Sequence, residues 1–195
     1  HGFKTLFPIP LGLAATWDAQ IVEKSSEISA FEASAAGIRW TFAPMLDIAR
    51  DSRWGRIAES PGEDTYLATI LGKAYIKGFQ GDDLSNPHRI AASAKHYIAY
   101  GAAMGGRDYN TVNLSEPLLR NVYLPPFKSA IDAGAATVMS SFNEINGIPA
   151  TGNEFLLKDV LRGELQFDGF VVSDCNFEHF TKRPDFEILA SHCFS

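Results

Sequence analysis

Gly169-Phe170-Val171-Val172-Ser173-Asp174 is the stretch of sequence that decides the fold. It is a short apolar run with a β-branched pair, and it ends in one carboxylate. Such a run is typical of a strand buried on both faces, as the strands of a parallel sheet are. In a (β/α) barrel the functional side chains follow the C-terminal ends of the strands. We therefore predict that Asp174 lies at a barrel mouth. The alternative is that Ser173 or Asp174 only caps a following helix.

Apolar strand-like runs alternate with amphipathic helical runs along the rest of the chain. This alternation is typical of βαβ units around a parallel sheet. The predicted helices are Ala19–Ala36, Thr65–Gln80, Glu116–Ala133 and Glu154–Leu165, and the predicted strands are Ile9–Leu13, Ile38–Ala43, Ile90–Ala94, Ala136–Ser140 and Phe170–Val172. A complete eight-unit barrel typically has about 250 residues. The 195 residues here therefore predict an α/β fold, an incomplete (β/α)8 barrel with about five βα units.

Residues at the predicted helix ends support these boundaries. Side chains that cap helix N-termini stand at each start: Asp18, Asp64, Ser115 and Asn153. Glycines follow three of the helices, where a left-handed residue or a tight turn is expected before the next strand: Gly37, Gly134 and Gly169.

Composition narrows the class of protein. The net charge is −6, and the Lys and Arg residues are scattered among acids, so a nucleic-acid partner is not expected. The apolar stretches are too short or too interrupted by Pro and Gly to predict a membrane span. The spacing of Cys175 and Cys193 matches no metal or redox pattern. We predict no metal and no cofactor.

Two long irregular regions, Pro44–Gly62 and Tyr97–Asn113, follow predicted strands and are candidate binding loops. Within the first loop, Arg56 is the candidate ligand-binding residue, because a guanidinium offers a fixed fork of donors for vicinal hydroxyls or carboxylates. The neighbouring charges are interpreted as structural ion pairs: Arg53, Glu59 and Glu63.

Lys95 and His96 stand directly after the predicted strand Ile90–Ala94. Neighbouring residues of a strand point to opposite faces, so both side chains reach one site only if the backbone bends. The alternative is that one faces a ligand and the other is a core partner. A Lys on a barrel strand can also form a Schiff base with a carbonyl substrate, so a lyase is a second possible chemistry.

Phe142 follows the predicted strand Ala136–Ser140 and would add an aromatic wall at the same edge of the sheet. Because the ends of parallel strands meet at one edge, the candidate residues are expected to line one pocket: Arg56, Lys95, His96, Phe142 and Asp174. Such a pocket offers hydrogen-bond donors, an apolar wall and one carboxylate.

The sequence resembles glycoside hydrolase family 3 from His1 to about Cys175. The resemblance is carried by Gly169–Asp174, Lys95-His96-Tyr97, Arg53-Trp54-Gly55-Arg56, Gly62-Glu63-Asp64, and His1-Gly2 with Phe7-Pro8. Within the family, the chain is most similar to bacterial β-glucosidases of the periplasmic type, through Gly78–Asp82 and Gly106–Thr111.

The resemblance implies a retaining hydrolase that cleaves terminal non-reducing β-D-glucosyl residues. It implies that Asp174 is the nucleophile and that Arg56, Lys95 and His96 hold the hydroxyls of the sugar in subsite −1. The implied partner is a small β-glucoside or oligosaccharide, and the implied location is periplasmic or secreted. The rival interpretations are a non-catalytic carbohydrate-binding module and a lyase that uses Lys95.

The chain also departs from the family's pattern. Family β-glucosidases take their acid/base Glu from a second α/β domain, which these 195 residues are expected to lack, so we expect them to be inactive alone. We expect residues 1–175 to be part of the barrel domain and residues 176–195 to be a divergent or truncated tail. Cys175 replaces the family's aromatic residue, and Arg183-Pro184 would interrupt a helix in that tail.

Overall fold

The computed structural model describes residues 4–174. Its main helices are α1 (Pro10–Ala14), α2 (Ala19–Ala35), α3 (Thr65–Gln80), α4 (Glu116–Leu118), α5 (Leu124–Asp132) and η6 (Phe155–Glu164). Its strands are β1 (Trp40–Thr41), β2 (Ala91–Tyr97), β3 (Thr137–Ser140), β4 (Glu144–Ile145), β5 (Ile148–Pro149) and β6 (Phe170–Ser173). The predicted tail at 176–195, both cysteines and the His1-Gly2 pair lie outside the described residues.

Four of the strands form one parallel sheet in the order β1-β2-β3-β6. The register pairs Trp40 with Ala91, and Thr137 with both Ser93 and Phe170. Strands β4 and β5 form a small antiparallel hairpin beyond the end of β3. This arrangement confirms the α/β class and the barrel-type parallel sheet. Within residues 4–174 the sheet does not close into a barrel.

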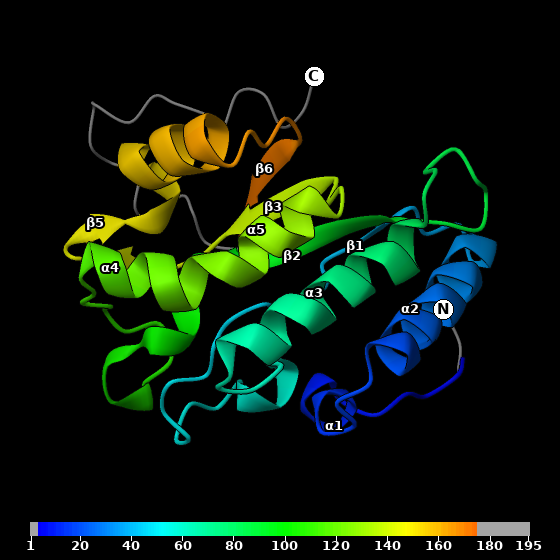
Figure 1. Ribbon diagram of the computed structural model, residues 1–195, viewed down its shortest axis with the longest axis horizontal. Coiled ribbons are helices and arrows are strands. Elements are labelled where there is room, and N and C mark those ends of the chain that lie inside the picture. Colours follow the sequence, from blue (N-terminus) through cyan, green and yellow to red (C-terminus); the bar gives the residue numbers. More distant parts are fainter. Residues whose placement is uncertain (1–3, 175–195) are drawn as a thin grey trace.

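Helices α2, α3 and α5 lie side by side along one face of the sheet (Figure 1). The core forms where α3 and α5 meet β2 and β3, and the small side chains Ala92 and Ala94 let those helices approach β2 closely. Buried Gln80, at the end of α3, connects the helix to the sheet. Its side-chain amide oxygen, Oε1, accepts hydrogen bonds from the backbone N–H groups of Ala92 and Ala136. This bond network fixes the starts of β2 and β3 relative to α3.

The predicted strand Ile9–Leu13 is wrong, because this segment forms helix α1. Pro10 occupies the first turn of α1, where its fixed φ suits a helix and its missing N–H is not needed. The same missing N–H would have interrupted a ladder of strand hydrogen bonds. The described sheet therefore contains four parallel strands, not five.

The predicted helix Glu116–Ala133 is broken into three consecutive pieces: α4, a π-helical turn at Leu119–Tyr123, and α5. Pro125 and Pro126 lie in the first turn of α5 and have no N–H to donate to the preceding turn. The helical path therefore continues, but its hydrogen-bond pattern changes before the prolines.

The predicted helix caps are confirmed. Each of the four capping side chains accepts a hydrogen bond from a backbone N–H in the first turn of its helix: Asp18, Asp64, Ser115 and Asn153. Gly37 and Gly134 have φ values of 83° and 88°, as expected at helix ends. Gly169 is needed for another reason: a Cβ there would collide with the Ala136 carbonyl oxygen, so it lets β6 approach β3.

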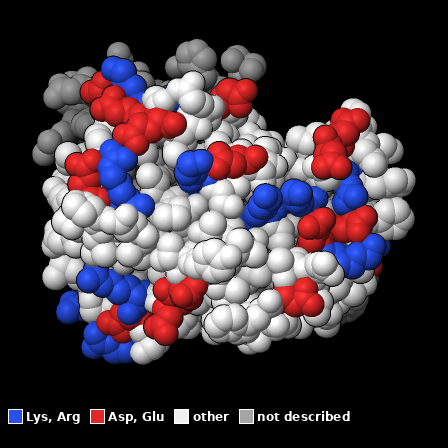
Figure 2. All heavy atoms as spheres, viewed as in Figure 1, with Lys and Arg blue, Asp and Glu red and all other residues white. Residues whose placement is uncertain are grey.

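Acidic and basic side chains are interspersed on the face shown in Figure 2. Several are joined in surface ion pairs, including Lys128 with Asp132 and Arg120 with Glu164. Among residues 4–174, every helix is too short or too polar to cross a membrane. In the same residues, no three or more His, Cys, Asp or Glu side chains cluster in a way that could hold a metal ion.

Candidate active site

The five candidate residues all lie at or beyond the C-terminal ends of the parallel strands. Lys95 and His96 belong to the last part of β2, Phe142 follows β3, and Asp174 follows β6. Arg56 lies in the long loop after β1, beside the short 3-10 turn Ile57–Glu59. Four strand or loop ends therefore meet at one edge of the sheet, as the sequence predicts.

His96 is the centre of this cluster, and only 1% of its surface is exposed. Its Nδ1 lies 2.7 Å from Oδ2 of Asp47, and its backbone N–H donates to the same oxygen at 3.1 Å. A carboxylate can only accept, so the ring carries its proton on Nδ1 in this contact. The other ring nitrogen, Nε2, lies 3.3 Å from Oδ2 of Asp174. Asp47 thus turns the imidazole toward Asp174.

The side chain of Arg56 approaches the imidazole of His96 from the loop after β1. Its Nε and Nη2 donate to the two oxygens of Glu59 at 2.8 and 2.9 Å, and Nη2 lies 3.4 Å from His96 Nε2. The hydrogen bond from Arg56 holds the pKa of Glu59 below its usual value, and Glu59 in turn raises the pKa of Arg56. Glu59, interpreted from sequence as architectural, is indeed the partner that orients Arg56.

Lys95 lies within electrostatic range of the same charged groups as His96, because, after Arg56, the charges of both side chains contribute to the lowered pKa of Glu59. The pairing of β2 with β3 shifts between Lys95 and Tyr97. This irregularity changes the alternation of side chains at the end of β2. Burial, followed by the charge of Arg56, lowers the pKa of Lys95, while the carboxylates of Glu59 and Asp174 oppose that shift. Lys95 is therefore within electrostatic range of Asp174.

An aromatic group forms the wall of the site. The ring of Tyr100 packs edge-on against His96 at 5.2 Å between centroids and lies under the Arg56 guanidinium at 5.4 Å. Phe142 packs against Tyr100 at 5.9 Å. The Tyr100 hydroxyl donates to Asp108 at 2.5 Å, and burial followed by this bond raises the pKa of Tyr100. Phe142 therefore belongs to an aromatic group beside the cluster, and buried Tyr100 joins it to His96.

No sequence pattern assigns a role to Asp47, Tyr100 or Asp108. Asp47 stands 49 positions from His96, so no local pattern shows that the two are paired. The sequence feature that points to Asp47 is its position in the loop after the predicted strand Ile38–Ala43, as Lys95 follows the predicted strand Ile90–Ala94. Tyr100 lies in the second predicted binding loop, but a tyrosine in a loop carries no specific signal.

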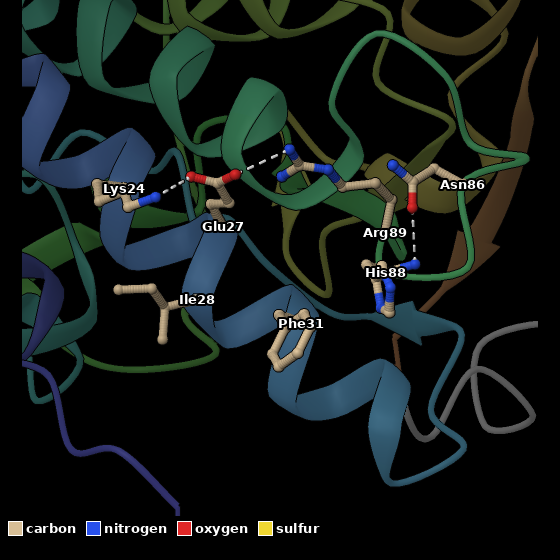
Figure 3. Close-up of a pocket in the computed structure, with 7 residues that line it drawn as sticks. All are labelled: Lys24, Glu27, Ile28, Phe31, Asn86, His88 and Arg89. Carbon is tan, nitrogen blue, oxygen red and sulfur yellow. Dashed lines mark hydrogen bonds and ion pairs between the residues drawn. The ribbon is translucent and has the colours of Figure 1, made fainter.

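A separate pocket of about 320 Å³ lies between α2 and the loop before β2. Figure 3 shows that it is lined by ion-paired Lys24, Glu27 and Arg89 together with Phe31 and His88. Its loop residues precede β2, whereas the cluster around His96 follows it. The pocket therefore lies at the opposite end of the strand and contains none of the candidate residues.

The cluster combines one carboxylate with three nitrogen-bearing side chains and an aromatic wall. Asp174 is 13% exposed in its side chain and His96 is buried, so a small ligand would meet both at the bottom of the site. Donors of this kind suit a molecule rich in hydroxyl groups, and the rings suit its apolar face. The fold and the cluster are those expected of a (β/α)-barrel protein with a candidate ligand site at the C-terminal edge of its sheet.

Comparison with known proteins agrees with this class. Residues 1–187 match the model of the glycosyl hydrolase family 3 N-terminal domain. The chain is 48% identical over 174 residues to a periplasmic β-glucosidase of Salmonella typhimurium, covering 89% of this chain and 23% of that protein. It is 41% identical to a β-xylosidase of Formosa agariphila, covering 90% of this chain and 25% of that protein. The chain belongs to glycosyl hydrolase family 3.

The chain is also similar in structure to solved β-glucosidases. The crystal structure of a β-glucosidase from Listeria innocua in complex with isofagomine has a TM-score of 0.86 and 52% identity, covering 89% of this chain and 25% of that chain. A β-glucosidase involved in saponin metabolism from intestinal bacteria has a TM-score of 0.88 and 38% identity, covering 92% of this chain and 25% of that chain. The present chain thus spans about a quarter of the length of these relatives.

Proposed function

We propose that the protein containing this chain is a retaining β-glucosidase in which Asp174 is the nucleophile. The observation that carries this proposal is the position of Asp174 beyond β6, with its Oδ2 3.3 Å from His96 Nε2 and within electrostatic range of Lys95. A retaining glycosidase needs one carboxylate that attacks the anomeric carbon. Family membership supports the same reaction, because relatives of high identity bear the name β-glucosidase.

The neighbouring side chains suit the binding of the terminal sugar in subsite −1. Arg56, Lys95 and His96 present nitrogen atoms around Asp174 from two different segments, so they can hold several hydroxyl groups at once. Phe142 supplies part of the apolar wall. Because Glu59 already orients Arg56, the Arg56 guanidinium needs little reorganisation when a sugar binds.

The proton donor of the reaction is proposed to come from another part of the protein. A retaining enzyme places its second carboxyl group about 5–5.5 Å from the first and keeps it protonated at the start. Among the described residues near Asp174, Glu59 has a lowered pKa because Arg56 donates to it, and Asp47 is enclosed with His96. Neither suits an acid, so we expect the described residues alone, 4–174, to leave aryl β-glucosides intact.

Glucosides are the proposed substrates in preference to xylosides, because the β-glucosidase relative has the higher identity, 48% against 41%. A terminal β-D-glucosyl residue on a small glucoside or oligosaccharide is the expected ligand. The name of the Salmonella typhimurium relative supports a periplasmic location, and we extend that to a periplasmic or secreted protein.

Substitution of the nucleophile in the full-length protein tests the proposal. Asp174→Asn should reduce kcat/KM for an aryl β-glucoside by at least about 10³-fold. Asp168→Asn, an exposed carboxylate that precedes the same strand, is the matched control and should change it less than twofold. The first product should be the β anomer when followed by NMR. Undiminished turnover by Asp174→Asn, or trapping of a substrate on Lys95 by borohydride, would exclude this mechanism.

A further inference from the structure

Asp108 connects the two loops that lie on either side of the candidate site. It is an exposed residue in the loop after β2. Its Oδ1 accepts a hydrogen bond from the indole N–H of Trp54 at 2.9 Å and another from the hydroxyl of Tyr100 at 2.5 Å. Trp54 belongs to the loop after β1 and shortly precedes Arg56, whereas Tyr100 shortly follows His96. One carboxylate oxygen therefore joins the segment of Arg56 to the segment of His96.

Both groups that donate to Asp108 come from buried rings. Trp54 is 1% exposed and Tyr100 is 0% exposed, and the two rings pack edge-on with their centroids 5.4 Å apart. A buried indole N–H or phenol O–H needs an acceptor, because leaving it unpaired costs free energy. Asp108 supplies that acceptor for both groups. It therefore fixes the polar ends of two rings whose apolar parts are already packed.

The Tyr100 ring in turn supports two residues of the site. The guanidinium carbon of Arg56 lies over this ring, 5.4 Å from its centroid, and the ring of His96 packs edge-on against it at 5.2 Å. The pKa of Arg56 is raised mainly by Glu59, and Tyr100 contributes to the same shift. Arg56 thus has two supports, because Glu59 accepts from its donors and Tyr100 lies against its face.

Gly106 lets the loop of Asp108 approach the loop of Trp54. Its φ is 65°, in the left-handed region that glycine adopts without strain. A Cβ at this position would lie 3.0 Å from the carboxylate of Asp51 and 3.0 Å from the backbone nitrogen of Trp54, which is tighter than ordinary van der Waals contact. The two loops therefore already meet through their backbones, and the side chain of Asp108 adds the bond to the indole.

We propose that Asp108 is a positioning residue that holds Arg56 in place for the substrate. This inference rests on the proposed function, in which Arg56 binds hydroxyl groups of the terminal sugar. Asp108 acts without touching the sugar: it holds Tyr100, whose ring lies under the guanidinium, and Trp54, which precedes Arg56 in the loop. Without the carboxylate, the indole is no longer tied to the loop of Tyr100. The guanidinium then moves relative to the sugar, and small displacements of this kind are costly in rate.

Substitution of Asp108 in the full-length protein tests this inference. Asp108→Ala removes the shared acceptor, so kcat/KM for an aryl β-glucoside should fall about tenfold. Asp108→Asn keeps an oxygen that can accept both bonds, and it should retain at least about half of the wild-type kcat/KM. Asp82→Ala is the matched control, because Asp82 is an exposed aspartate in the loop before β2, and it should leave kcat/KM unchanged. Equal losses in Asp108→Ala and Asp108→Asn would overturn the inference, because the hydrogen bonds would not be the cause.

Two further variants separate positioning from a general loss of structure. In the background of Arg56→Ala, Asp108→Ala should lower kcat/KM by less than about twofold more, because no guanidinium remains to be positioned. Tyr100→Phe keeps the ring and removes only the hydroxyl, so it should lower kcat/KM by at least about threefold.

Two outcomes of these variants would overturn the inference. One is a tenfold effect of Asp108→Ala that persists without Arg56, and the other is a Tyr100→Phe variant as active as the wild type. Either outcome would leave the role of Asp174 intact, because the loss of turnover in Asp174→Asn tests that role separately.

Discussion

Truncation of Asp47 tests how the site is held together. The Asp47 side chain is completely buried and reaches no sugar in the proposed mechanism, yet it accepts two hydrogen bonds from His96. Asp47→Ala removes both and leaves the imidazole N–H without its partner. The ring that faces Asp174 then loses its orientation, so both stability and turnover should fall.

The expected magnitude follows from the two oxygens of Asp47. Breaking a buried, hydrogen-bonded pair of this kind costs about 3–5 kcal/mol. However, Oδ1 of Asp47 accepts no hydrogen bond from any described residue, and burying such an atom already costs about 1–3 kcal/mol, which alanine removes. The net loss should therefore be about 2 kcal/mol, the difference between the middles of these two ranges. In a unit of about 200 residues this lowers Tm by roughly 4–8 °C.

Calorimetry of the full-length protein and steady-state kinetics measure the two effects. A misplacement of about 1 Å can cost about 100-fold in rate, so kcat/KM of Asp47→Ala should fall by roughly that factor. Asp47→Asn is the matched control, because its amide oxygen can accept both bonds that Oδ2 now accepts. It should melt within about 2 °C of the wild type. A melting point and kcat/KM unchanged in Asp47→Ala would refute the positioning role.

Two other substitutions examine neighbouring contacts. Gly169→Ala places a methyl group against the backbone carbonyl of Ala136, the residue before β3. It should therefore cost about 1–3 kcal/mol in unfolding free energy and reduce kcat/KM by displacing Asp174. Glu59→Gln removes the ionised partner of Arg56 and should lower Tm at neutral pH. The loss in unfolding free energy should be no more than about 1 kcal/mol for this partly exposed pair. The pKa of Glu59 is lower in the folded protein than its ordinary value of 4.5. The stabilisation by Glu59 is therefore complete above pH 4.5 and is lost as the pH falls through the lowered pKa of the folded state.

The controls for these substitutions are available in the same chain. Gly163→Ala meets only one atom within 4 Å, the Lys158 carbonyl oxygen at 3.4 Å, and should leave Tm and turnover nearly unchanged. If Gly169→Ala behaves like Gly163→Ala, close packing of β6 on β3 is not required. For Glu59→Gln, a Tm difference from the wild type that does not shrink as the pH is lowered from 4.5 through the acid range would show that its charge is not the cause.

The sequence predicts the fold best where local patterns and chain chemistry agree. Four helix caps, four strands and two left-handed glycines are where the pattern places them. The failure at Ile9–Leu13 arises because an apolar run of five residues fits a strand or a short helix equally well. Pro10 was the deciding residue, since a proline suits the first turn of a helix better than a strand ladder.

The site was predictable to the extent that it depends on strand ends. Lys95, His96, Phe142 and Asp174 meet because the ends of parallel strands share one edge of the sheet. The contact of His96 with Asp47 was not predictable, because it depends on how the loop after β1 returns to β2. The register shift at the end of β2 was not predictable either, because the sequence of one strand does not show how it pairs with its neighbour.

Identification of the residue that bonds to the sugar tests the central claim most directly. The full-length protein would be inactivated with a 2-deoxy-2-fluoro-β-glucoside, digested and mapped by mass spectrometry. We predict a single glycosyl adduct on the peptide that contains residues 169–174, located at Asp174. An adduct on any other carboxylate, or complete inactivation with no adduct at Asp174, would contradict its assignment as the nucleophile.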